Sequence, residues 1–411
     1  MTSNFTVYQR KKTNTNILKS LALLSIAVYI FLMVVFETLN SPLASLASYG
    51  IYACLGFCGI YILSREKIKV YWLFVALFVF GVLLSVSALY TKTAFSFIIP
   101  YIRRYWTSLI LIFVIANVLD SPRDINFLLN VLIISGAALS LYLYTFYGWE
   151  YLINAEERLD DAFGNQNNTA VRCAFSVIFA IYKTVTSNKR ILRFLWLVPA
   201  AICIPAIMFL ASRKAILMIA VALVTLLFTY SKNKNFVKKM MVILIILVAL
   251  WYVIQNVPAF SIIKDRLDNT FAFFSGDAGE DSIADLNRVY YIKASLMAFL
   301  ESPVIGNGFY YSQYLLGTYS HNNYIELLLN NGIIGFCVYY FCYVKMFREA
   351  GGLKKTSRLA YVFIITTMMT FVAMDVGVVS YFNRYTLIIL MLCCVTCAVH
   401  QNAIEENAGA E

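Results

Sequence analysis

The chain has 411 residues, of which 61% are hydrophobic and 13% are charged, and its mean hydropathy is +0.73. A soluble domain is about half apolar and about a quarter charged, so a soluble core could not bury this much apolar surface. The composition therefore predicts an all-α polytopic membrane protein. The net charge of +11 fits the excess of Lys and Arg in cytoplasmic loops, so we expect membrane lipids and no nucleic acid as partners.

Apolar runs long enough to cross a bilayer, about 20 residues each, recur along the chain. The fourth run carries Arg103 and Arg104 near its start, and the seventh and eighth are separated only by a tight turn around Ser212. We predict about 12 transmembrane helices, at approximately 20–37, 43–63, 70–89, 98–119, 125–146, 168–185, 194–211, 214–230, 239–256, 332–347, 359–377 and 382–399.

The distribution of Lys and Arg predicts the orientation of these helices. The basic segment 1–19 runs directly into the first apolar run without a small-residue cleavage site, which predicts a retained helix rather than a signal peptide. With this end inside, the short basic loops fall on the cytoplasmic face and the long loops on the outer face. We therefore predict that both termini are cytoplasmic.

This layout divides the chain into three regions. Residues 1–256 hold nine spans and a smaller outer loop at 147–167, and residues 332–411 hold three spans and a short cytoplasmic tail. Between them, residues 257–331 form one large periplasmic or extracellular loop between the ninth and tenth spans. Long loops without repetitive composition usually carry function, so this loop is the predicted catalytic region.

No metal or cofactor site is expected. Cys393, Cys394 and Cys397 lie inside an apolar run with only His400 nearby, so packing explains them better than metal binding. The acidic run at 276–285 lacks the spacing of a calcium loop and is interpreted as solvated loop.

Arginines on the predicted outer face are the first candidate site residues. Snorkelling at the membrane interface explains such arginines without a ligand, although a tight turn leaves Arg213 little room for it. Guanidinium groups match phosphate oxygens as a bidentate fork, so arginines that converge at the outer surface predict a site for a lipid-linked phosphate or pyrophosphate. The residues concerned are Arg103, Arg104, Arg158, Arg213, Arg288 and Arg384.

His321 is the only histidine on the predicted outer face. In its segment, SHNNYIELLLNN, the residues Asn322, Glu326 and Asn330 recur every four positions opposite an apolar stripe, which predicts a short amphipathic helix on the membrane surface. A lone histidine is more often structural than catalytic, but it titrates near pH ~6.5 and can act as a general base. With no second histidine on this face, a metal site is not expected.

Four motifs stand in order along the chain. The segment RLDDAFGNQNNTA contains Arg158, Gly164, Asn165 and Asn168, and FLASRKAIL contains Arg213. A longer pattern ends in SPxxGxG and then HNNYIELLLNNGIIG, and it is carried by Arg288, Ser302, Pro303, Gly306, Gly308, His321, Asn322, Asn323, Gly332 and Gly335. The last, looser match is FVAMDVGVVSYFNR, with Asp375 and Arg384. Together these motifs resemble the O-antigen ligase and O-antigen polymerase superfamily.

The resemblance implies a membrane glycosyltransferase of the bacterial inner (cytoplasmic) membrane, with its active site on the periplasmic or outer face. It implies inverting, metal-independent transfer, without a cofactor, from an undecaprenyl-pyrophosphate-linked glycan donor to a sugar hydroxyl, in O-antigen or capsule or exopolysaccharide assembly. On this basis, the catalytic candidates are Arg213 and Arg288, which would hold the pyrophosphate, and His321, which would deprotonate the acceptor hydroxyl. The substrate-binding candidates are Arg158, Asn165, Asn168, Gly306, Gly308, Asn322, Asn323, Glu326, Arg103, Arg104, Asp375 and Arg384.

Three alternatives remain open at this point. The acceptor is a lipid-linked repeat unit in a polymerase and lipid A-core in a ligase; the polymerase is slightly favoured because nothing in the chain marks a lipid A-core acceptor. A transporter also fits twelve spans, but it predicts internal repeats and paired broken helices. No repeat is visible, and Pro199 and Pro205 lie in the seventh span without a matching pair.

Overall fold

The computed structural model describes residues 2–37, 39, 41–65, 67–155, 159, 161–230, 235–275 and 283–408. These residues form helices and connecting loops and include no strand, which confirms the predicted all-α fold. The helices are α1 (Thr2–Phe36), α2 (Ala44–Leu63), α3 (Trp72–Ser87), α4 (Phe95–Val118), α5 (Pro122–Tyr147), α6 (Trp149–Asn154), η1 (Asp161–Phe163), α7 (Gln166–Thr186), α8 (Arg190–Phe209), α9 (Arg213–Tyr230), α10 (Phe236–Asn256), η2 (Pro258–Phe260), α11 (Ser261–Ser275), α12 (Ile283–Glu301), α13 (Tyr311–Leu316), α14 (Asn323–Gly352), α15 (Arg358–Asp375) and α16 (Arg384–Ala408).

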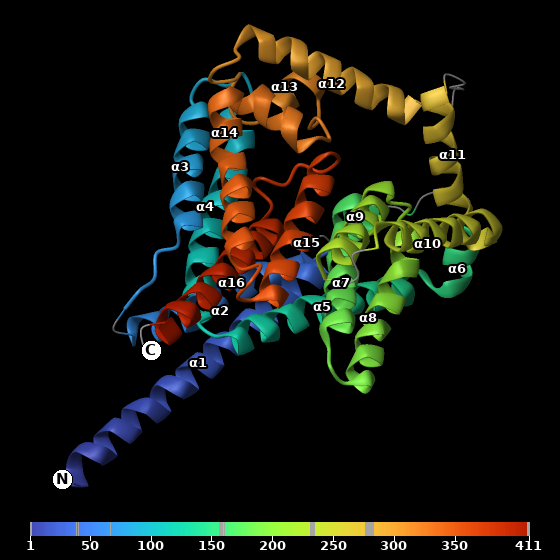
Figure 1. Cartoon of the computed structure of the whole chain (residues 1–411). Helices are drawn as coiled ribbons and strands as arrows, with labels where there is room; N and C mark the ends of the chain where they lie inside the picture. The colour runs from blue at the N-terminus through green and yellow to red at the C-terminus, as the bar shows by residue number, and fades with distance from the viewer. Residues whose placement is uncertain are drawn as a thin grey trace.

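Ten of the described helices are long and apolar enough to cross a membrane, namely α1 from Ile17, α2, α4, α5, α7, α8, α9, α14, α15 and α16. The third predicted span is α3, an apolar helix of only 16 residues, or about 24 Å of rise against ~30 Å of hydrocarbon. The ninth predicted span lies in α10, which runs across the direction of α7, α8 and α9 rather than along it (Figure 1). The structure thus supports ten spans, and the total of twelve remains a prediction.

Short-range signals fix where several of these helices begin. Ser121 caps α5 by accepting a hydrogen bond from the backbone N–H of Asp124, whose carboxylate accepts one from the N–H of Ser121 in return. Pro122 opens the same helix, where its missing N–H costs no hydrogen bond. Asn165 and Asn322 cap α7 and α14 in the same way, by accepting from the first backbone N–H groups.

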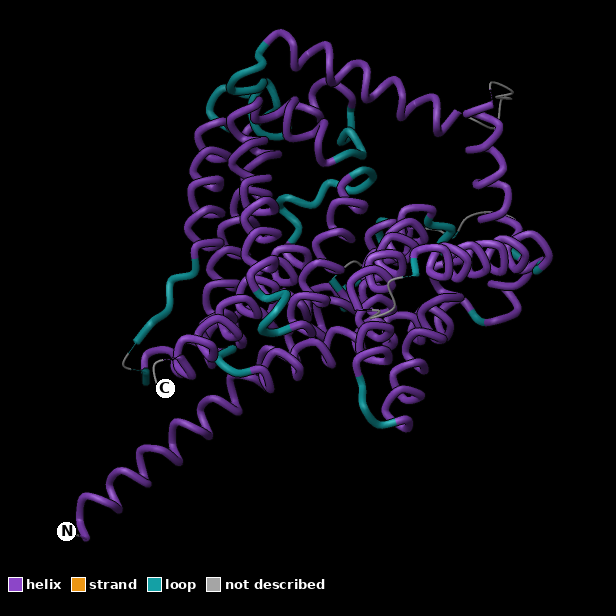
Figure 2. The backbone as a smooth tube through the Cα atoms, viewed as in Figure 1, coloured by secondary structure: helices purple, strands orange, loops and turns teal. Residues whose placement is uncertain are grey.

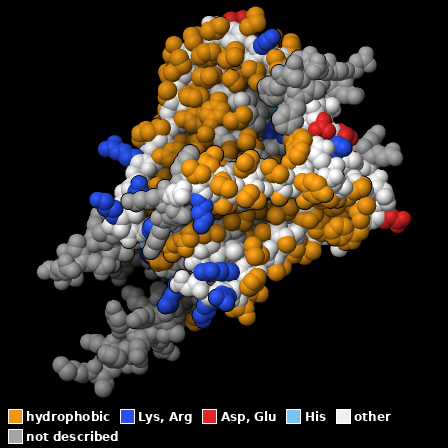
Figure 3. All heavy atoms as spheres, turned by 45° about the vertical axis from the view of Figure 1, so that its right-hand side comes forward, with side chains coloured by type: hydrophobic (Ala, Val, Ile, Leu, Met, Phe, Trp, Pro, Cys, Tyr) orange, Lys and Arg blue, Asp and Glu red, His pale blue; other side chains and the backbone are white. Residues whose placement is uncertain are grey.

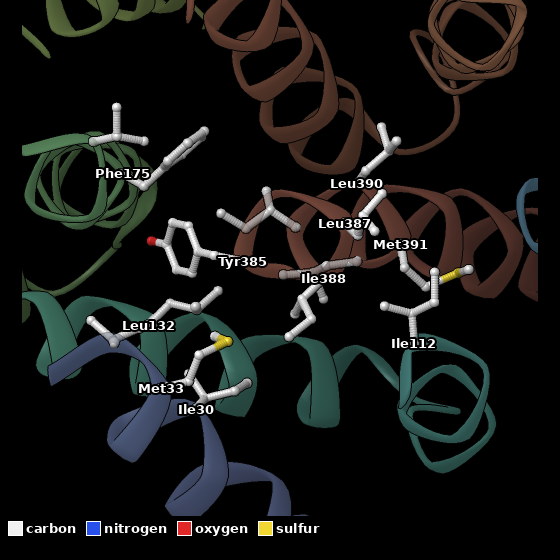
Figure 4. Packing of buried hydrophobic residues seen from close by; sticks show 14 of the residues in the cluster. Ile30, Met33, Ile112, Leu132, Phe175, Tyr385, Leu387, Ile388, Leu390 and Met391 are labelled. Atoms are coloured by element: carbon white, nitrogen blue, oxygen red, sulfur yellow. The ribbon is translucent and has the colours of Figure 1, made fainter. Parts of the chain in front are cut away.

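The central helix of the bundle is α16. Within its span 78% of the residues are buried, more than in any other of the ten, and it contacts α3, α4, α5, α14 and α15. A helix that is apolar on all sides is expected in such a position. Figure 4 shows its side chains packed against those of the surrounding helices, with Tyr385, Leu387, Ile388, Leu390 and Met391 of α16 near Ile30, Met33, Ile112, Leu132 and Phe175.

The peripheral helices expose large hydrophobic side chains, among them Leu63, Val75, Phe194 and Leu244. Figure 3 shows broad hydrophobic areas on one face of the molecule, with clusters of Lys and Arg below them. An apolar surface of this extent would be unfavourable in water and suits contact with lipid. Both marked chain ends lie at the side of the molecule opposite α12 (Figure 1).

The region expected to be a large outer loop is mostly helical in its described residues. It contains η2, α11, α12 and α13, and the long helix α12 spans the gap between α11 and the ends of α3 and α14 (Figure 1, Figure 2). Through its contacts with α14 and α13, α12 is fixed to the helical bundle.

The structure differs from the sequence-based expectation at residues 323–331. These residues form the first turns of α14 rather than a separate surface helix, and α14 is interrupted at Gly332 (φ 60°, ψ −166°). The turn at 303–308 fills this break: the N–H of Ile333 donates to the carbonyl of Pro303 at 2.9 Å, and the N–H of Gly308 donates to the carbonyl of Asn330 at 2.8 Å. The backbone groups freed by the break are therefore satisfied, as burial requires.

Candidate functional site

A cavity of about 230 Å³ lies where α4, the starts of α7 and α9, and the loops before α14 and α16 meet. Two of its lining side chains, Arg104 and Lys214, are cationic, and none is acidic. Pockets of this kind combine aromatic walls with a few polar groups that orient a ligand. The lining residues are Tyr101, Arg104, Asn165, Asn167, Asn168, Lys214, Tyr310, Tyr319, Gly377, Val378, Val379, Phe382 and Asn383.

The asparagines at the start of α7 form one wall of the cavity. Asn165 caps this helix by accepting from the N–H groups of Asn167 and Asn168, at 3.0 and 3.3 Å. Its amide donates to the hydroxyl of Tyr319 at 2.9 Å, which links α7 to the loop before α14. A helix N-terminus carries partial positive charge, so this wall favours an anion.

The basic pair at the start of α9 divides between two surroundings. Lys214 lines the cavity and donates a hydrogen bond to the carbonyl of Gly377. Arg213 points toward α11 and donates to the carbonyl of Arg266 at 3.0 Å. Of the two, Lys214 contributes its charge to the cavity, although the sequence motif drew attention to Arg213.

His321 lies beside the cavity, half-buried between two tyrosines. Its ring centroid is 4.1 Å from that of Tyr319 and 6.1 Å from that of Tyr291, and its Nδ1 atom is buried without a hydrogen-bond partner among the described residues. Burial, and then the charges of Lys214 and Arg288, lower the pKa of His321 from 6.5 to about 4. The imidazole is therefore neutral at pH 7 and able to accept a proton, with Arg288 and Lys214 close enough to act on it.

Strained backbone conformations are concentrated in the segments that line or flank the cavity. Among the described residues, the non-glycine residues with positive φ are Ala211 (48°), Tyr310 (61°) and His321 (60°). Ala211 precedes the basic pair of α9, Tyr310 lines the cavity, and His321 is the candidate base. Such conformations cost about 1–3 kcal/mol each and cluster at functional sites.

Two of the arginines named from the sequence as substrate-binding candidates form ion pairs with Glu37, the residue that follows α1. Arg104 and Arg384 each lie near the same carboxylate oxygen, at 3.0 and 3.3 Å, and Arg172 of α7 pairs with the other at 2.9 Å. Burial by itself raises the pKa of Glu37, but the three guanidinium groups outweigh it and keep that pKa below its usual value. Arg103 is exposed and lies outside the cavity lining.

Glu326 is buried and holds the loop before α14 in place. Its carboxylate accepts from the hydroxyl of Ser312 at 2.5 Å, the N–H of Ser320 at 2.8 Å and the amide of Asn330 at 2.9 Å. Asn322 is the cap of α14. The polar face of this helix is therefore directed inward, against the loop, rather than toward the membrane surface.

Asn323 and Asp375 form a second buried group of polar side chains. The amide of Asn323 donates to Asp375 at 3.2 Å, and its oxygen accepts from the N–H of Ser380 at 2.8 Å. Asp375 also accepts from the hydroxyls of Tyr340 and Tyr343, both at 3.0 Å. These contacts fix the loop between α15 and α16, which supplies one side of the cavity.

The glycines at 306 and 308 have close backbone neighbours rather than a place in the cavity lining. A Cβ on Gly306 would lie 2.5 Å from the backbone nitrogen of Asn331, and a Cβ on Gly308 would lie 2.7 Å from the carbonyl oxygen of Ser87. Their positive φ angles of 73° and 98° favour glycine as well. Of the other candidates, Asn165, Asn168 and Arg104 line the cavity, and Arg158 lies outside the described residues.

Sequence reasoning missed several residues of this region. Lys214 could have been found as the neighbour of Arg213. Glu37 and Arg172 gave no signal beyond being single charges at the ends of apolar runs, because their pairing depends on how α1 and α7 pack.

Fold and site together define a multi-pass all-α membrane protein with a cationic, amide-lined cavity beside a strained histidine. Residues 198–340 match the family model described as O-antigen ligase, a range that includes Arg213, Lys214, Arg288 and His321. The match confirms the resemblance to the O-antigen ligase and polymerase superfamily, and it supports glycan assembly of that general type by a membrane glycosyltransferase-type enzyme. No curated protein sequence matches the chain.

Proposed function

We propose that this protein is an inverting, metal-independent glycosyltransferase of the bacterial inner membrane, acting at its outer face with both termini in the cytoplasm. The donor is an undecaprenyl-pyrophosphate-linked saccharide, and the acceptor is a sugar hydroxyl. The observation that carries the proposal is the neutral His321 beside a cavity whose lining includes cationic side chains and no carboxylate.

In the proposed reaction His321 is the general base. Its neutral imidazole takes the proton of the acceptor hydroxyl while the hydroxyl oxygen attacks the anomeric carbon from the face opposite the leaving group. The bond from that carbon to the diphosphate oxygen breaks, and its electron pair stays on the diphosphate. Lys214 and Arg288 stabilise the negative charge that develops there, which removes the need for a metal ion.

The charges around His321 couple its basicity to the donor. Without a ligand, burial and the charges of Lys214 and Arg288 keep its pKa at about 4, which makes it a weak base. A bound diphosphate offsets both positive charges and raises that pKa, so the imidazole becomes a stronger base when the donor is present. Proton transfer is thereby favoured in the complex that can react.

Two acceptors fit this chemistry. A polymerase acts on the sugar of a second lipid-linked repeat, and we favour it slightly because no feature of the chain marks a lipid A-core acceptor. A ligase acts on lipid A-core, and the description of the matching family model favours that reading. A transporter built on inverted repeats is expected to contain broken helices in corresponding pairs. The interruption of α14 at Gly332, described above, was not found together with a matching break in a corresponding span among the described residues.

The test is His321→Ala in a strain that lacks the native protein, with surface polysaccharide resolved on a gel and membrane insertion measured in parallel. His400→Ala is the matched control, since His400 lies in α16 and bonds to Ser357 at 3.0 Å, away from the cavity. Loss of polymer with single lipid-linked repeats accumulating identifies a polymerase. Loss of attachment with long lipid-linked chains still made identifies a ligase. Normal polysaccharide from an inserted His321→Ala protein removes the general-base role and favours the transporter.

A further inference from the structure

The cluster formed by Glu37, Arg104, Arg172 and Arg384 carries more positive than negative charge. Its described ion pairs all end on the single carboxylate of Glu37. The arginines come from three helices, α4, α7 and α16, and are brought together only by the packing of the bundle. Three guanidinium groups against one carboxylate leave a surplus of positive charge in a partly buried place, which is unfavourable unless a counter-charge is supplied.

Two of the three arginines are occupied by the protein. Arg172 has a side chain only 3% exposed and donates to the carbonyls of Met33 and Val34 as well as to Glu37. Arg384 has a side chain 11% exposed and donates to the hydroxyl of Ser108 in addition to its contact with Glu37. Neither lines the cavity.

Arg104 differs from both. Its side chain is 41% exposed and lines the cavity, and its Nη2 atom donates a hydrogen bond to Glu37. Its Nε atom is buried and has no hydrogen-bond partner among the described residues. The surplus charge of the cluster therefore reaches the cavity through Arg104, and a counter-ion can meet it there.

The surroundings of Arg104 indicate what kind of molecule brings that counter-ion. Tyr101 lies one turn before it in α4 and stacks on Tyr310, with ring centroids 4.4 Å apart and planes inclined by 24°. Phe382 lies 5.9 Å from Tyr101 and 5.8 Å from Tyr310 by ring centroids. All three line the cavity, so an aromatic wall stands beside the guanidinium. Such walls bind the C–H face of a sugar ring, while a guanidinium binds oxyanions in bidentate fashion.

Arg104 and His321 belong to different parts of the site. The cations that act on His321 are Lys214 and Arg288, and Arg104 is not among them.

We propose that Arg104 is the binding residue of a second oxyanion site, which takes an anionic group of the saccharide substrate, and that Glu37 is the positioning residue that aims it. The oxyanion is either the carboxylate of a uronic acid sugar or a further oxygen of the carrier diphosphate. The identity of the ligand rests on the proposed function, whereas the existence of the site rests on the cluster and the cavity.

Binding is measured with the purified full-length chain in nanodiscs, by the shift of its thermal unfolding midpoint on titration with two probe pairs. Undecaprenyl diphosphate is compared with undecaprenol, and glucuronate with glucose. Arg104→Gln removes the charge, and Arg104→Lys keeps it but loses the bidentate fork. Arg123→Gln is the control, because Arg123 is an exposed arginine in the first turn of α5.

For the anion that occupies the site, we expect Arg104→Gln to weaken binding about 10- to 100-fold, with a smaller loss for Arg104→Lys and none for Arg123→Gln. Glu37→Gln should also weaken the binding of that anion. The response to the neutral probes, undecaprenol and glucose, should be the same in every variant. Loss confined to glucuronate assigns the oxyanion to the sugar, and loss confined to the lipid assigns it to the diphosphate. Anion binding equal to wild type in both Arg104 variants, or no wild-type response to either anion, overturns the site.

The proposed function is separated from this inference by one further variant. His321→Ala should bind the anion as wild type does and yet make no polymer. If it binds the anion and still makes polymer, the proposed catalysis fails while the oxyanion site stands. If it makes no polymer and the Arg104 variants bind the anions normally, only the oxyanion site fails.

Discussion

Replacing Lys214 with methionine removes one of the two positive charges that lower the pKa of His321. The three causes together take this pKa from 6.5 to about 4, with burial the largest, Lys214 second and Arg288 third. Because burial exceeds the effect of Lys214, the lysine accounts for less than half of the difference. We therefore expect the pKa of His321 in Lys214→Met to rise by about one pH unit or less.

The assay is the pH dependence of kcat/KM for purified enzyme with a lipid-linked donor. His321 acts as a base only when neutral, so the rate falls as the pH drops through its pKa, and kcat/KM reports the free enzyme. The acid limb should lie near pH 4 in the wild type and near pH ~5 in Lys214→Met. In kcat, which reports the enzyme with bound donor, the acid limb should lie at higher pH than in kcat/KM, because the diphosphate offsets the same charges.

Lys214→Arg is the matched control, since it keeps the charge and its acid limb should stay near that of the wild type. Lys214 also bonds to the carbonyl of Gly377, so the thermal unfolding midpoint of each variant must be compared before the rates are interpreted. An active Lys214→Met enzyme whose acid limb coincides with that of the wild type, or lies below it, would refute the electrostatic account of His321.

Two further predictions concern the turn at 303–308 and the charge on α12. Gly306→Ala should lower the unfolding midpoint more than Gly317→Ala: both glycines have φ near 70° (73° and 68°), but only at Gly306 would the new Cβ meet backbone, at 2.5 Å from Asn331. We expect the extra loss to be about 1–3 kcal/mol, and equal midpoints would contradict the proposed packing. Arg288→Lys should reduce kcat at least about tenfold with normal insertion, because an ammonium cannot make a bidentate contact to diphosphate; full activity would mean that charge alone suffices.

The membrane class and the helical fold follow from the sequence alone. Apolar runs of about 20 residues form helices in lipid, because a helix satisfies its own backbone hydrogen bonds where no water is available. The number of spans is less well determined, since α3 is short and α10 runs across its neighbours. The direction of α10 depends on packing, which hydropathy does not encode.

The motifs also named residues that the structure places at or near the cavity. Arg288 and His321 were singled out by residue type and order, and in the structure the charge of Arg288 is close enough to lower the pKa of His321. Asn165 and Asn168 were named from a loop motif and line the cavity. In these cases the short-range pattern and the three-dimensional arrangement agree.

Only the tertiary structure decides the surroundings of the other polar residues. From sequence, Glu326 and Asp375 are substrate-binding candidates, but both lie buried among hydrogen-bond donors. The donors of Glu326 are close to it in sequence, whereas Tyr343 and Asn323, which donate to Asp375, are 32 and 52 positions away. Glu37 and Arg104 are 67 positions apart, and their ion pair exists because α1 and α4 pack together. Hydropathy and residue type act over a few turns of one helix, whereas the partner of a buried charge is fixed by which helices meet, and that depends on the packing of the whole bundle.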